Sequence, residues 1–144
     1  MTDSTSFFII NTLRLPELIQ EDIDSLYDRY EELMTQATHI TQEIKPVVGG
    51  GGGPAGKIEP LVLQMVKVAE EIESKLRHLY EAREERQRLL NMIQDPNTRA
   101  LVAARFIERK SYLQIARENN VSKTAVINAV KKAVSTIAEQ KVEV

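Results

Sequence analysis

Residues 111–134 read SYLQIARENNVSKTAVINAVKKAV and have the apolar spacing of two short helices joined by a tight turn. In the first helix Ile115 is followed by the small Ala116, so a second helix can cross closely above it. Asn120 suits the turn, because asparagine adopts a positive φ more readily than most other residues. Ser122 is a favourable N-cap for the helix that follows. The spacing predicts a helix-turn-helix.

The second helix of this motif has one apolar face and one polar face. Its apolar residues recur at spacings of three and four: Val126, Ala129, Val130, Ala133 and Ile137. The other face carries Lys123, Thr124, Asn128, Lys131 and Lys132. A polar and basic face at this place is typical of a helix that enters the DNA major groove.

Nine residues are the candidate DNA contacts: Ser111, Tyr112, Ser122, Lys123, Thr124, Ile127, Asn128, Lys131 and Lys132. We expect Thr124 and Asn128 to recognise bases, since an asparagine amide can both donate to and accept from adenine. Lys131 and Lys132 lie further along the helix and are expected to bind phosphate. Ile127 either contacts a thymine methyl group or packs inward.

The charge of the chain is unevenly distributed. Residues 1–57 hold four bases and nine acids, and residues 58–94 have a net charge of −1. Residues 95–144 hold nine bases and five acids, which gives +4. Because phosphate neutralisation dominates nucleic-acid affinity, the segment with the motif is also the one best able to approach DNA. The acidic N-terminal segment, residues 1–57, is expected to have another function.

Two long helices are predicted before the motif, separated by a connector at residues 46–57 that contains all six glycines. Pro16 is expected in the first turn of the first helix, and the second helix is expected to begin near Pro60. The first has a coiled-coil seam of Ile19, Ile23, Leu26, Tyr30, Leu33, Ala37, Ile40 and Ile44. The second has Val62, Met65, Ala69, Ile72, Leu76 and Leu79. Arg83 and Arg86 interrupt this second seam and are predicted to lie on a solvated face with weak ion pairs.

The predicted fold is all-α, with a long antiparallel helical hairpin followed by a three-helix bundle. Residues 1–94 are predicted as the hairpin and oligomerisation region, and residues 95–144 as the DNA-binding domain. The bundle core is expected to contain Leu101, Phe106, Ile107, Leu113, Ile115, Val121, Val126 and Val130. A two-helix hairpin buries only one stripe per helix, so we expect a homo-oligomer. A partner protein such as RNA polymerase could cover the same surface.

Several classes of function are disfavoured by the sequence. There is no cysteine, and His39 and His78 lie far apart without a matching ligand set, so we predict no metal site. No glycine-rich loop ends in Lys-Ser or Lys-Thr, so we predict neither an enzyme nor a bound cofactor. No apolar run approaches the roughly 20 residues of a membrane span. A cytoplasmic protein without a membrane partner is expected.

The interrupted helical hairpin followed by DPNTRALVAARFIERKSYLQIARENNVSKTAVINAVKKA resembles the small phage-encoded transcriptional regulators of the RinA and ArpU type. The C-terminal parts of these proteins are similar to region 4 of sigma factors. The matching features are Asp95-Pro96, Phe106-Ile107, Ile115-Ala116 and the capping Ser122. The resemblance implies control of phage late or packaging genes, or of related host genes, in the cytoplasm of a bacterial host cell.

Two other functions remain open from the sequence. A phage small terminase subunit also joins a helix-turn-helix to a helical oligomerisation hairpin, although its DNA-binding unit usually comes first. Alternatively, the hairpin binds RNA polymerase or a host factor and the basic bundle does not bind DNA. Only a DNA-binding function predicts sensitivity to substitution of Lys123 and Asn128.

Overall fold

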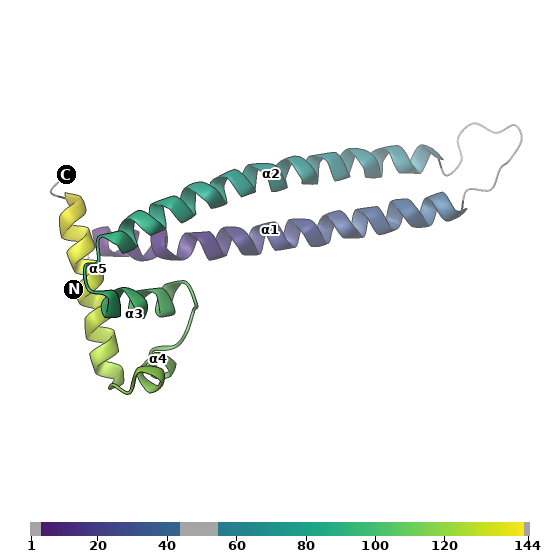
Figure 1. The fold of residues 1–144 in the computed structure, drawn as a ribbon. Coiled ribbons are helices and arrows are strands. Elements are labelled where there is room, and N and C mark those ends of the chain that lie inside the picture. Colours follow the sequence, from purple (N-terminus) through teal and green to yellow (C-terminus); the bar gives the residue numbers. More distant parts are fainter. Residues whose placement is uncertain (1–3, 44–54, 143–144) are drawn as a thin grey trace, which may run out of the picture. The chain divides into compact units, whose positions relative to one another are not determined.

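The computed structural model describes residues 4–43 and 55–142. Within these ranges the chain forms helices and no strands, which confirms the predicted all-α class. The elements are α1 (Ser4–Glu43), α2 (Ala55–Asn91), α3 (Pro96–Phe106), α4 (Tyr112–Asn119) and α5 (Lys123–Val142) (Figure 1). None of these helices is both long enough and apolar enough to cross a membrane.

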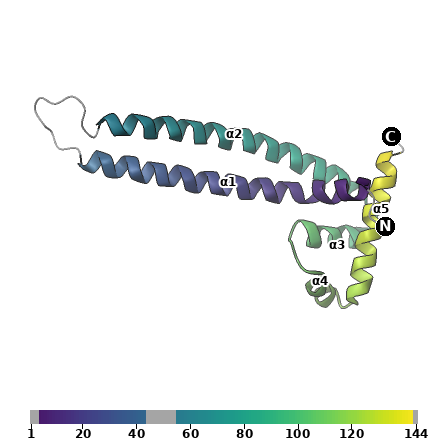
Figure 2. The same cartoon turned by 180° about the vertical axis from the view of Figure 1, so that it is seen from behind.

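The helices belong to two compact units, which we describe separately. The two-segment unit comprises residues 19–79, of which 19–43 in α1 and 55–79 in α2 are described. These two segments lie side by side and run in opposite directions (Figure 1 and Figure 2). Ile23, Leu33, Ile72 and Leu79 are buried along the contact. In this unit Lys75 Nζ lies 3.3 Å from Asp22 Oδ2, an ion pair between the two helices. Arg29 also donates a hydrogen bond to Gln64 Oε1 at 3.3 Å.

The seam of α2 differs from the prediction at alternate positions. Val62 and Ala69 are exposed, whereas Leu61 and Val68 are half-buried. Either pair, combined with Met65 and Ile72, gives spacings of three and four. The sequence of this helix alone is therefore compatible with burial of either pair. The partner helix selects the set that is buried, and the prediction was wrong on Val62 and Ala69.

Both long helices begin earlier than predicted, and each contains a proline. Pro16 lies inside α1, although an interior proline costs about 3 kcal/mol. Ile9, Leu13 and Pro16 are fully buried. Burying an aliphatic side chain contributes about 1.5–3 kcal/mol, so two of them offset the cost of the proline. Pro60 lies inside α2, whose first three residues, 55–57, were expected in the connector; residues 46–54 lie outside the described residues.

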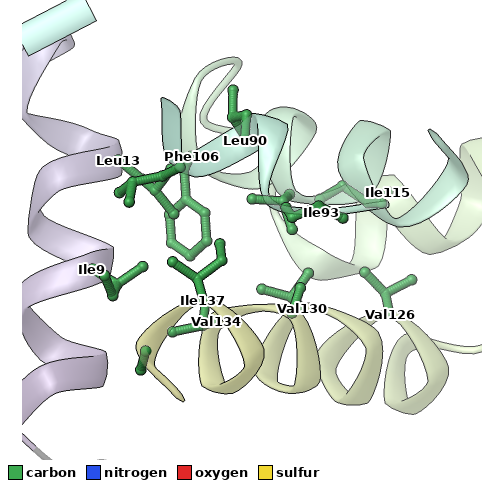
Figure 3. Close-up of a cluster of buried hydrophobic side chains, with 14 of the residues drawn as sticks. Ile9, Leu13, Leu90, Ile93, Phe106, Ile115, Val126, Val130, Val134 and Ile137 are labelled. Carbon is green, nitrogen blue, oxygen red and sulfur yellow. The ribbon is translucent and has the colours of Figure 1, made fainter. Parts of the chain in front are cut away.

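The five-segment unit comprises residues 1–18 and 80–144. Its core draws on all five helices, with Ile9 and Leu13 from α1, Leu89 and Leu90 from α2, and apolar residues of α3 to α5. Phe106 lies among Ile9, Leu13 and Ile137 (Figure 3). The predicted division into domains 1–94 and 95–144 stays a prediction.

Most of the core predicted for the three C-terminal helices is buried in this unit. Phe106, Ile115, Val126 and Val130 are buried, and Leu101 and Ile107 pack against them partly buried, but Leu113 and Val121 are each 47% exposed. Val102, which the prediction left out, is also buried. On α4 the inward positions are taken by Ile115 and Ala116, which leaves Leu113 on the outer side. These two residues were wrongly assigned to the core.

Candidate nucleic-acid interface

Serine residues cap both helices of the predicted motif. Ser111 Oγ accepts a hydrogen bond from the backbone N–H of Gln114 at 3.1 Å, at the start of α4. Ser122 Oγ accepts one from the N–H of Ala125 at 3.1 Å, at the start of α5. Each cap satisfies a backbone donor that has no partner within its helix. The predicted cap at Ser122 is confirmed, and Ser111 caps α4 in the same way.

The turn between α4 and α5 depends on a left-handed residue. Asn120 has φ 54° and ψ 42°, as predicted from the tolerance of asparagine for this region. The next N–H, that of Val121, donates to Ala116 O at 3.1 Å, which closes the turn through the backbone. The turn therefore does not depend on burial of the Val121 side chain. Asn119, the last residue of α4, donates from Nδ2 to Ile115 O at 2.8 Å.

Substitution of Asn120 should change stability according to the cost of a positive φ. We expect Asn120→Gly to raise the free energy of unfolding by about 0.5–1 kcal/mol, because glycine adopts this conformation without steric penalty. Asn120→Val should lower it by about 1–2 kcal/mol, since a β-branched residue is strained there. Thermal unfolding of the three chains measures the order. A native chain more stable than Asn120→Gly would contradict this account.

The polar residues predicted for the recognition surface lie on the outer side of α5. Val126 and Val130 are buried against the core of the five-segment unit. The exposed residues are Lys123, Thr124, Asn128, Lys131 and Lys132. Residues 123–138 contain these three lysines and no acid, and none of the three forms an ion pair with another described residue. This exposed surface of α5, which we call the α5 polar face, therefore carries uncompensated positive charge.

Two of the other candidate contacts are partly engaged inside the unit. Tyr112 is half-buried, packs against the core and lies under the guanidinium of Arg105, with Cζ 4.2 Å from the ring centroid. Ile127 is also half-buried. Ser111 and Ser122 are exposed residues at the helix starts that they cap. The surface available to a ligand therefore consists mainly of the five α5 residues and the two serines.

Lys110, which lies just before α4, forms two ion pairs. Lys110 Nζ lies 2.8 Å from Glu118 Oε2 and 3.2 Å from Glu108 Oε2. Its hydrogen bonds to these two carboxylates raise the pKa of Lys110. The same contact with Lys110 lowers the pKa of Glu118. Both acids are thereby paired with Lys110 and not with a lysine of the α5 polar face.

Asp95 holds the start of α3 through its carboxylate. Its Oδ2 accepts a hydrogen bond from Thr98 Oγ1 at 2.7 Å, and both oxygens accept from backbone N–H groups of Asn97 and Thr98. The Thr98 hydroxyl is the largest cause of the lowered pKa of Asp95, and the backbone N–H groups and Arg99 add to it. Pro96, the first helical residue, has no N–H to leave unsatisfied.

The lowered pKa of Asp95 predicts how stability changes in acid. The ordinary value for this carboxyl is 3.8, so its contribution is complete above that pH and is lost as the pH falls through the lower folded value. We expect the gap in melting temperature between the native chain and Asp95→Asn to be constant from pH 7 to about 5 and to narrow below about 3.8. A gap that is the same at pH 7 and pH 3 would contradict this assignment.

A second group of basic residues was missed in the sequence. Arg14, Arg105 and Arg109 line one cavity of about 340 Å³ in the five-segment unit. Arg14 lies on α1 and Arg105 on α3, so no local spacing brings them together. A signal in the sequence was the basic segment Arg105 to Lys110, which precedes α4 and was not assigned a role.

Comparison with known proteins identifies a family. Residues 45–138 match the family model described as "Protein of unknown function (DUF1492)". No curated protein matches the chain. No solved structure matches it either. The matched region covers more than half of the chain and includes α2 to α4 and most of α5. The chain therefore belongs to the DUF1492 family.

Proposed function

We propose that this protein is a sequence-specific DNA-binding transcriptional regulator in which α4 and α5 act as a helix-turn-helix. The observation that carries the proposal is the α5 polar face, exposed directly after a left-handed turn and free of acids over residues 123–138. The second helix of such a motif places its N-terminal residues against base edges in the major groove. The resemblance of residues 95–133 to RinA- and ArpU-type regulators supports the same function.

Different parts of the α5 polar face have different roles in this proposal. The first turn of α5 contains Lys123 and no acid, and it lies at the positive end of the helix dipole, an arrangement that favours a DNA phosphate. Thr124 and Asn128, one turn apart, contact base edges. Lys131 and Lys132 lie further from the turn and bind the phosphate backbone.

The two-segment unit is proposed to join copies of the chain. Its described surface keeps several large apolar side chains about half exposed: Tyr27, Met34, Val62, Leu63 and Val66. Two paired helices bury one stripe each, and further helices could cover this remaining apolar surface. A dimer would recognise two half-sites about one helical turn, or a multiple of it, apart.

The test is a binding measurement on the full chain. Fluorescence anisotropy with duplexes tiled across the surrounding genome region, at several salt concentrations, should give fragment-selective binding that weakens steeply as salt rises. Equal, weak binding to every fragment would contradict sequence specificity. Absence of binding would favour the interaction-protein alternative. Rings of eight or more chains in solution would favour the small terminase alternative.

A further inference from the structure

The arginine cavity lies between the first part of α1 and the end of α3, within the five-segment unit. Its lining includes Asn11, Arg14, Glu17, Arg105, Phe106 and Arg109. None of the three arginines is among the candidate DNA contacts predicted from the sequence.

The three guanidinium groups are in excess over acids in this cavity. Glu17 is the one acid among the lining residues, and it forms an ion pair with Arg86 in which both side chains are mostly buried. The charge of Glu17 is thus matched by an arginine outside the cavity lining. The lining of this half-open cavity thus holds three arginines and one acid that is already paired, which favours an anion.

Two of the arginines are held in place by aromatic rings. The Cζ atom of Arg14 lies 5.3 Å from the centroid of the Phe106 ring. Arg105 stacks on Tyr112 and donates from Nη1 to Lys110 O at 3.1 Å. These contacts favour one position of each guanidinium group, so less rotamer entropy is lost when a ligand binds.

The Nε atom of Arg105 is buried and has no hydrogen-bond partner among the described residues, so a ligand in the cavity would not reach it. Arg109, which also lines the cavity, has a positive φ of 58°, a conformation uncommon for residues other than glycine. Strained backbone of this kind concentrates at ligand sites.

We infer that this cavity binds a phosphoryl group. The forked donors of arginine match the oxygens of phosphate, and charge-assisted hydrogen bonds of this type are the strong ones. Asn11 adds an amide donor, and the Phe106 ring contributes an apolar wall. The phosphoryl group comes either from a free phosphorylated compound or from the DNA backbone. Only the second source rests on the proposed function.

The experiment uses the full chain and Arg14→Gln, because Arg14 is exposed and its described contact is the Phe106 ring. Arg83→Gln is the matched control, since Arg83 is an exposed arginine of the same unit outside the cavity. Each chain is titrated with inorganic pyrophosphate by calorimetry. Each is also titrated with a duplex of unrelated sequence by anisotropy at several salt concentrations. Circular dichroism verifies that the variants are folded.

Binding of pyrophosphate that weakens about tenfold or more in Arg14→Gln and is unchanged in Arg83→Gln would support a free phosphorylated ligand. A salt slope for the duplex that falls by about 0.9 in Arg14→Gln alone would assign the cavity to a backbone phosphate. If Arg14→Gln behaves like Arg83→Gln in both titrations, or the native chain binds neither probe, the inference is overturned.

The two proposals fail separately in this design. Pyrophosphate binding that depends on Arg14, in a chain that does not bind DNA, would refute the regulator and leave the cavity assignment standing. DNA binding that is insensitive to Arg14, without pyrophosphate binding, would refute the cavity assignment and leave the regulator standing.

Discussion

Phe106→Ala is expected to lower the free energy of unfolding by about 3–5 kcal/mol, the usual cost of truncating a buried phenylalanine. Phe106 is 3% exposed and packs among side chains from the start of α1 and from α5 (Figure 3). Its removal leaves a cavity where segments distant in sequence meet, and these helices cannot all move inward to fill it. Urea denaturation followed by circular dichroism measures the change.

The matched control for this substitution is Phe7→Ala. Phe7 lies on α1 of the same unit and is 61% exposed, so its truncation should change stability by no more than about 0.5 kcal/mol. If the two variants were equally stable, Phe106 would not join α1 to the C-terminal helices in the way described.

Arg86→Ala is expected to have the second largest effect on stability, about 2–3 kcal/mol. The side chains of Arg86 and Glu17 are only 12% and 23% exposed, so removing the arginine leaves a largely buried carboxylate without its partner. Breaking a fully buried pair costs about 3–5 kcal/mol, and the remaining exposure of Glu17 reduces this figure. Urea denaturation of the native chain and the variant measures the difference.

Two further variants separate the ion pair from general effects of losing an arginine. Arg77→Ala removes one partner of an exposed pair, with Arg77 and Glu73 67% and 72% exposed, and should cost less than about 0.5 kcal/mol. Arg86→Leu/Glu17→Leu replaces both charges with apolar groups and should recover most of the stability lost in Arg86→Ala. A double variant less stable than Arg86→Ala would contradict the account.

Features of the fold that depend on neighbouring residues were predictable from the sequence. The caps at Ser111 and Ser122 and the left-handed Asn120 follow from side chains that bond to backbone within three residues, or from the local tolerance of φ. The seam of α1 was also predictable: its described residues, from Ile19 to Ile40, are buried or half-buried, and Ile44 lies outside the described residues.

Features that depend on distant partners were not predictable. A proline normally marks the start of a helix, but burial of Ile9 and Leu13 extends α1 through Pro16. Arg86 follows the pattern of a solvated face, and only its contact with Glu17 changes that interpretation. Val121 is apolar, as core residues usually are, but the turn is closed by backbone hydrogen bonds and the Val121 side chain stays exposed.

The same distinction applies to the candidate site. The α5 polar face could be predicted because a single helix displays its own residues at fixed spacing. The arginine cavity could not, because it joins residues of α1 and α3 that are far apart in the chain. Tyr112 was predicted as a DNA contact, and its ring is also used to hold Arg105.

The central claim is that the α5 polar face recognises DNA, and the most direct test is an anisotropy titration of the selected fragment with Lys123→Ala/Asn128→Ala. The control is Lys67→Ala/Gln36→Ala, which removes an exposed lysine and an exposed amide from the two-segment unit. We predict that the first variant binds about ten- to a hundredfold more weakly and loses its preference for the fragment, while the control binds like the native chain. Equal affinity of both variants for the fragment would contradict the proposed recognition helix.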